Sequence, residues 1–140
     1  MTTASGRLST GAKVRLAAEI VWNLIRVRSL LRRSDLPTTL ASLQRVNPNA
    51  AGPVTIQDAR RLAHAVRRTL RVLPADTRCL TQSLVLTAVL ARRGTTGALV
   101  IGVRPGNESG KDFGAHAWIE LDGHPLLPTS NGEFERLVAL

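Results

Sequence analysis

Residues 76–94 read DTRCLTQSLVLTAVLARRG, and this stretch predicts a helix with clear ends. Asp76 or Thr77 can accept hydrogen bonds from the first amide groups, and Gly94 stands where a left-handed residue often ends a helix. Apolar side chains recur along the stretch at helical spacing, which predicts that most of the helix is buried. The only cysteine of the chain, Cys79, lies in the first turn.

Cys79 occupies a position that favours a thiolate. The first amide groups of a helix have no partner within it, the helix dipole is positive at this end, and Arg78 adds a cation. A cysteine placed in this way can act as a nucleophile. A lone cysteine on an apolar helix is more often a packing residue, so the helix alone leaves both interpretations open.

Residues 113–123, FGAHAWIELDG, supply a candidate base. Their pattern predicts a strand that enters a tight Asp-Gly turn. His116 stands near the start of this strand between two alanines, so a thiol can approach its imidazole closely. A first-turn cysteine followed by a strand histidine is the arrangement that a thiol–imidazole pair needs.

The motifs around both residues resemble those of the leader peptidases of lasso-peptide biosynthesis, which are transglutaminase-like cysteine proteases. The similar segments are CLTQSL at 79–84, RRG at 92–94, LVIGVR at 99–104 and AHAWIELDG at 115–123. The resemblance is specific over residues 70–123 and looser over the remainder. It implies a papain-like or transglutaminase-like fold, and proteolytic removal of the leader from a ribosomally made precursor. It also implies that Cys79 is the nucleophile and His116 the general base.

The third catalytic residue departs from the family pattern. The similar family places an aspartate on the strand after the turn, whereas here residues 126–131 contain no carboxylate. Asp122 is a poor substitute, because six residues of strand put it about 20 Å from His116. A two-residue hairpin would place Thr129 opposite His116 and Asn131 two residues further on the same face. We therefore name Asn131 as the orienting residue of the imidazole, with Thr129 next.

Charge divides the chain into two parts. Residues 1–74 carry thirteen Lys and Arg against three Asp and Glu, whereas residues 75–140 carry six against seven. The length permits one domain, residues 1–140, with a basic helical part up to residue 74 and a catalytic helix and sheet from residue 75. A single cysteine excludes an internal disulfide framework, which favours a reducing cytoplasm.

Helical periodicity predicts further helices at residues 12–33, from about Pro37 to Val46, and from Ile56 onward with Thr55 as the cap. The apolar face of the first of these is expected to be Val14, Ala17, Ala18, Val21, Leu24, Ile25 and Leu31. Its arginines rule out a simple membrane span. A basic amphipathic helix can lie on a membrane surface, but we favour packing on the core and expect no membrane contact.

The clustered arginines fit either nucleic acid or an acidic protein or peptide partner. Modules that bind nucleic acid usually add stacking aromatics, and this chain has no tyrosine and few other aromatics, so we expect no nucleic-acid partner. The family resemblance implies three protein partners instead. These are the leader segment of the precursor, a small separate leader-recognition protein and the cyclase that closes the ring.

The sequence therefore predicts an α+β fold in which the cysteine helix packs against a small antiparallel sheet. The predicted reaction is peptide-bond hydrolysis, with the Cys79 amide group helping to hold the oxyanion and no metal or cofactor required. Two alternatives stay open. One is a non-catalytic scaffold that binds the leader or the cyclase, and the other is a nucleic-acid accessory protein.

Overall fold

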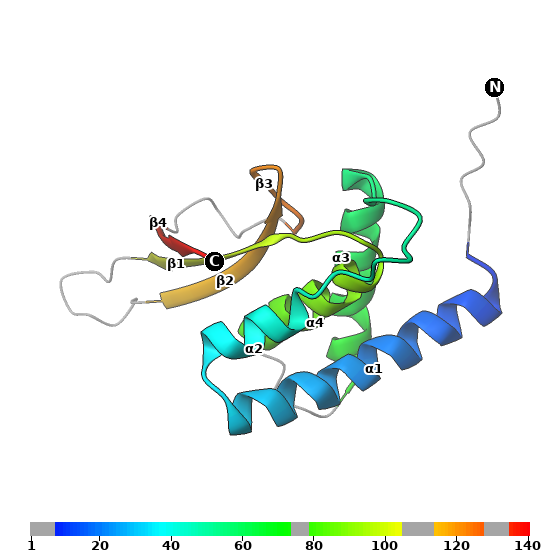
Figure 1. The fold of residues 1–140 in the computed structure, drawn as a ribbon, viewed down its shortest axis with the longest axis horizontal. Helices are drawn as coiled ribbons and strands as arrows, with labels where there is room; N and C mark the ends of the chain where they lie inside the picture. Colours follow the sequence, from blue (N-terminus) through cyan, green and yellow to red (C-terminus); the bar gives the residue numbers. More distant parts are fainter. Residues whose placement is uncertain (1–7, 74–78, 105–113, 128–134) are drawn as a thin grey trace.

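The computed structural model describes residues 8–73, 79–104, 114–127 and 135–140. Within these ranges four helices come first and a four-stranded antiparallel sheet follows, which confirms the predicted α+β class. The elements are α1 (Thr10–Arg33), α2 (Leu36–Leu43), α3 (Ile56–Val72), α4 (Cys79–Arg92), β1 (Ala98–Arg104), β2 (Gly114–Leu121), β3 (His124–Pro125) and β4 (Glu135–Ala139). Figure 1 shows the sheet beside the helices.

Short polar side chains begin the first three helices. Ser9 accepts a hydrogen bond from the Ala12 amide at 3.2 Å, and Asp35 accepts one from the Thr38 amide at 2.9 Å. Thr55 accepts one from the Asp58 amide at 3.2 Å, as the sequence predicts for α3. Each of these caps satisfies an amide group that has no partner inside its helix.

The central element is α4, in which residues 83–91 are all buried. It packs between the other helices and β2, and Gly94 follows it with a φ of 80°, as expected for a helix-terminating glycine. The connection between α2 and α3 satisfies the carbonyl groups at this end. The Asn47 amide donates to the Ala91 carbonyl at 3.0 Å, and the Asn47 side chain donates to the Arg92 carbonyl at 3.4 Å.

The expected apolar face of α1 is partly wrong. The buried residues are Ile20, Asn23, Leu24 and Val27, whereas Val14 and Ile25 are 63 % and 57 % exposed. The helix carries two apolar stripes, and periodicity alone does not tell which of them faces the core. Next to the buried stripe, the Glu19 carboxylate accepts two hydrogen bonds from Arg93 at 2.9 and 3.0 Å and so ties α1 to the end of α4.

The sheet has the order β3-β2-β1-β4, with antiparallel pairs throughout. Ala117, Ile119 and Leu121 of β2 belong to the hydrophobic core. His116, Trp118 and Glu120 alternate with them and therefore belong to the other face of the strand. The β2–β3 turn agrees with prediction, because Asp122 and Gly123 have φ of 52° and 79° and Leu121 pairs with His124.

The end of the chain forms β4, an exposed strand along the free edge of β1. The sequence predicts an apolar tail at residues 134–140 that packs back on the body, and residues 135–139 do so as a strand paired with β1. Leu140 exchanges two backbone hydrogen bonds with Leu99, at 2.7 and 2.9 Å. In the described ranges, no helix is both long enough and apolar enough to cross a membrane.

Candidate active site

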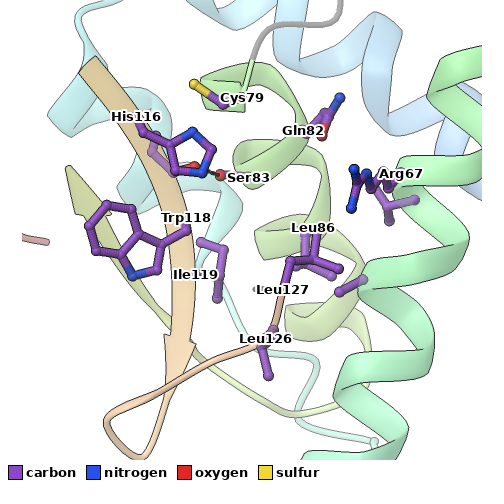
Figure 2. Close-up of a pocket in the computed structure, with 13 residues that line it drawn as sticks. Arg67, Cys79, Gln82, Ser83, Leu86, His116, Trp118, Ile119, Leu126 and Leu127 are labelled. Atoms are coloured by element: carbon purple, nitrogen blue, oxygen red, sulfur yellow. Dashed lines mark hydrogen bonds between the residues drawn. The ribbon is translucent and has the colours of Figure 1, made fainter. Parts of the chain in front are cut away.

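A pocket of about 50 Å³ lies where the start of α4 meets β2 and α3. That volume has room for about four water molecules, or for one side chain of a substrate. Cys79 and His116 both line it, and Figure 2 shows the thiol and the imidazole at the same end of the pocket. The structure thus brings together the two residues that the sequence selects as nucleophile and base.

Cys79 is the first residue of α4 and is half-buried. Amide groups in the first turn of a helix have no partner within the helix, so they can stabilise a negative charge on the sulfur or on an adjacent oxygen. The predicted caps Asp76 and Thr77, and the predicted cation Arg78, lie outside the described residues.

His116 lies on β2, directly opposite Gly102 of β1. The imidazole is partly buried, and this burial lowers its pKa below the usual 6.5, because the charged form loses hydration. The ring is therefore neutral at pH 7 and can accept a proton, which is the state that a general base requires.

Trp118 packs against the imidazole from the same strand. The two ring centroids are 5.8 Å apart, with an angle of 24° between the ring planes. The indole Nε1 donates a hydrogen bond to Oε1 of Glu120 at 3.0 Å, and Arg136 of β4 donates to Oε2 of the same carboxylate. Glu120 is buried, so this pairing with Trp118 and Arg136 satisfies a carboxylate that would otherwise be costly.

Gly102 makes this arrangement sterically possible. A Cβ at this position would lie 2.6 and 2.7 Å from two carbons of the Trp118 ring and 3.0 Å from the Glu135 carbonyl oxygen. Any side chain here would therefore displace the indole or move β4. The residue opposite the candidate base is a glycine because the indole occupies that space.

A hydroxyl joins the two elements that carry Cys79 and His116. Ser83 Oγ donates to the Ala117 carbonyl at 3.2 Å, and both residues are buried. This bond links α4 to β2 one turn after Cys79 and one residue after His116. It fixes the distance between the helix and the strand at the pocket.

The rest of the pocket wall is mainly apolar, with two polar side chains. Gln82 of α4 and Arg67 of α3 line the pocket, and Figure 2 shows them on the side away from His116. The apolar lining residues are Ala63, Val66, Leu86, Ala117, Trp118, Ile119, Leu126 and Leu127. A wall of this kind fits an apolar side chain next to the bond that reacts.

The structure does not test the expected third residue of the site. Asn131 and Thr129 lie outside the described residues, and the β2–β3 pairing that the structure describes ends at Pro125. Asp122 is exposed at the turn, and His64 and His124 are exposed as well. Among the described residues, no group of three or more His, Cys, Asp or Glu side chains could hold a metal ion.

Sequence reasoning assigns no role to several residues of the site. Ser83 is part of the CLTQSL motif, and its spacing of four residues from Cys79 is a signal for the same helix face. Glu120 alternates with His116, which predicts one common face of β2. Trp118 alternates in the same way, and for this residue the sequence allows a place either at the site or in the core. Arg67 is expected only as part of a basic helix face, because nothing local tells that α3 borders the cysteine.

Comparison with protein families gives one match. The family model described as the transglutaminase-like superfamily matches residues 21–139, which is most of the chain. The matched region contains α2, α3, α4 and the whole described sheet. No curated protein and no solved structure matches this chain.

Proposed function

The chain belongs to the transglutaminase-like superfamily, which includes cysteine proteases and acyltransferases, and from this we propose that it is a cysteine peptidase. The substrate that we propose is a ribosomally made lasso-peptide precursor, cleaved between leader and core. The motifs at 79–84 and 115–123 support this substrate by resemblance. The observation that carries the proposed chemistry is that Cys79 and His116 line the same small pocket.

The reaction begins with transfer of the Cys79 thiol proton to the neutral imidazole of His116. The sulfur then attacks the carbonyl carbon of the scissile bond, and the carbonyl electrons move to its oxygen. When this intermediate collapses, the C–N bond breaks and the imidazolium protonates the leaving amine. Water attacks the resulting thioester with His116 again as base, which releases the carboxylate and restores the thiol.

The start of α4 provides the electrostatic contribution. The oxyanion that forms in each half-reaction can accept a hydrogen bond from the amide of Cys79, at the positive end of the helix. The apolar wall formed by residues such as Leu86 and Leu126 would receive a substrate side chain and exclude water from the bond.

The orientation of the imidazole in this proposal depends on Trp118. Its indole covers one side of the ring and is itself held by Glu120 and Arg136. Asn131 remains our proposal for the group that hydrogen-bonds the second ring nitrogen, with Thr129 next. The proposed partners are the leader-recognition protein and the cyclase, and the proposed compartment is the cytoplasm.

The test is cleavage of a lasso-peptide precursor by the purified protein, with and without the leader-recognition protein, followed by mass spectrometry. We expect separate leader and core fragments from the wild type and none from Cys79→Ala. Precursor binding by Cys79→Ala should persist, because the exchange removes only the sulfur.

His116→Gln and His124→Gln make a matched pair for the same assay. Both histidines lie in the β2–β3 hairpin, but only His116 lines the pocket. His116→Gln should lower the cleavage rate by about 10²-fold or more, and His124→Gln should leave it unchanged. Unchanged processing by Cys79→Ala would favour the non-catalytic scaffold instead.

A further inference from the structure

The first half of α1 overhangs a groove. The four buried residues of this helix, Ile20, Asn23, Leu24 and Val27, all follow its first ten residues, which have none. In Figure 1 these first turns extend beyond the other helices. Two cavities of about 620 and 680 Å³ lie against them and share Leu8, Leu16, Leu62 and Arg93, so they form one continuous groove between α1, α3 and the end of α4.

The floor of this groove is apolar. Leu62 and Ala65 of α3 are half-buried there, and Leu16 of α1 faces them, while Leu8 is 53 % exposed at the rim. Apolar side chains that remain accessible in a concave site favour a partner with apolar side chains of its own.

The rim is cationic. The basic residues that line it are Lys13, Arg15, Arg61, Arg68, Arg92 and Arg93. Two acidic residues line it as well, and both are already paired. Glu19 binds Arg93, and Asp58 lies 3.6 Å from Arg61. Six cations against two anions leave a net charge of +4 around an apolar floor.

We propose that this groove binds an acidic amphipathic peptide segment of a partner protein. Leucine-like side chains on one face of the segment enter between α1 and α3, and its carboxylates pair with the guanidinium groups of the rim. Arginine suits this role because its planar fork binds both oxygens of a carboxylate.

Two other occupants fit the groove less well. None of the described residues that line it is aromatic, so bases have no stacking surface, and an apolar floor offers nothing to a phosphate backbone. A second copy of the chain would bring another net charge of +9 toward a surface that is already positive.

The groove and the candidate active site lie on opposite sides of α3. Ala63, Val66 and Arg67 line the pocket, whereas Leu62, Ala65 and Arg68 line the groove. A helix is about 10 Å thick, so a segment bound in the groove is held one helix width from Cys79. The binding proposal does not depend on peptidase activity.

Fluorescence anisotropy tests the proposal with a labelled peptide of about 20 residues, built from Leu and Glu at helical spacing. A second peptide carries Lys in place of each Glu, and a labelled single-stranded DNA is the third probe. We expect the wild-type chain to bind the Glu peptide most tightly of the three. Absence of binding, or tighter binding of the DNA, would overturn the proposal.

Two double variants with the same change in net charge test whether the peptide binds in the groove. Lys13→Glu combined with Arg68→Glu reverses two groove cations, and Arg32→Glu combined with Arg33→Glu makes the same change at the far end of α1. The groove pair should weaken binding of the Glu peptide by about ten-fold or more, and the control pair by less than about two-fold. Equal losses would show attraction by net charge alone and would contradict the proposal.

A variant at the rim tests the apolar contacts of the groove. Leu8→Ser removes an exposed side chain at the rim, so the fold is retained, and we expect about three-fold weaker binding of the Glu peptide. No change with Leu8→Ser would count against an amphipathic ligand. Because the probes are not cleaved, these results stand apart from the outcome of the Cys79→Ala assay.

Discussion

The indole of Trp118 lies over Gly102, the residue that pairs with His116 across β1 and β2. A side chain at position 102 would fill the space that the Trp118 ring occupies, and this ring also packs against His116. Through Glu120, the same ring is connected to Arg136 on β4. The edge strand β4 thus helps to position the imidazole of His116.

Gly102→Ala should displace the indole, because the new Cβ would lie 2.6 Å from it. We expect a loss of about 1–3 kcal/mol in the free energy of unfolding, measured by urea denaturation, together with slower cleavage. Gly11→Ala is the control, since a Cβ there meets nothing within 4 Å, and it should leave stability unchanged or slightly raised. Equal stability of Gly102→Ala and the wild type would contradict the described packing.

Glu120→Ala should destabilise the chain by about 1–3 kcal/mol, because the Trp118 Nε1 and the Arg136 guanidinium lose their acceptor. Glu120→Gln keeps an acceptor for the indole, so it should retain more cleavage activity than Glu120→Ala. Glu135→Gln, on the exposed edge strand, is the control and should change neither property. If Gln and Ala at position 120 reduce the rate equally, the indole does not position His116.

Ser83→Ala should separate α4 from β2 by removing the hydrogen bond to the Ala117 carbonyl. We expect a loss of about 1 kcal/mol in stability and a lower kcat for cleavage, because Cys79 and His116 are no longer held at a fixed spacing. Thr87→Val removes a buried hydroxyl that bonds only within α4, to the Ser83 carbonyl at 2.9 Å. Thr87→Val should lower the free energy of unfolding by a similar amount and leave kcat unchanged. An equal loss of kcat in both variants would refute the role of Ser83.

The pH dependence of cleavage follows from the burial of His116. A base must be unprotonated, and burial lowers the pKa of this imidazole, so the acid limb of kcat/KM should fall below pH 6.5. Trp118→Ala exposes the ring to water and favours its charged form, so the limb should move upward. If the acid limb of kcat/KM in the wild type lies above pH 6.5, or if it moves to lower pH in Trp118→Ala, burial of the imidazole does not set its position.

Local signals in the sequence were sufficient for much of this structure. Thr55 caps α3, Gly94 ends α4, and Asp122 with Gly123 turns β2 into β3, because each depends on a few neighbouring residues. The position of Cys79 on a helix and His116 on a strand follows from the same kind of pattern.

Features that depend on distant residues could not be predicted. The exposed residues of β4 show no alternation, and only pairing with β1 makes them a strand. The stripe of α1 that faces the core depends on what the helix packs against, and its Glu19 is paired with Arg93, seventy-four residues later. The hydrogen bonds from Arg136 and Trp118 to Glu120 can be predicted only when the order of the strands in the sheet is known. Asn131 lies outside the described residues.

Alkylation of the single cysteine measures the central claim, which is that His116 takes the proton of Cys79. Because the chain has one cysteine, the intact mass after iodoacetamide treatment reports Cys79 alone. The imidazole accepts the thiol proton as the sulfur attacks, so at pH 6.5 the wild type should be alkylated about ten-fold faster or more than His116→Gln, with His124→Gln matching the wild type. Equal rates in the wild type and His116→Gln across the pH range would contradict the account.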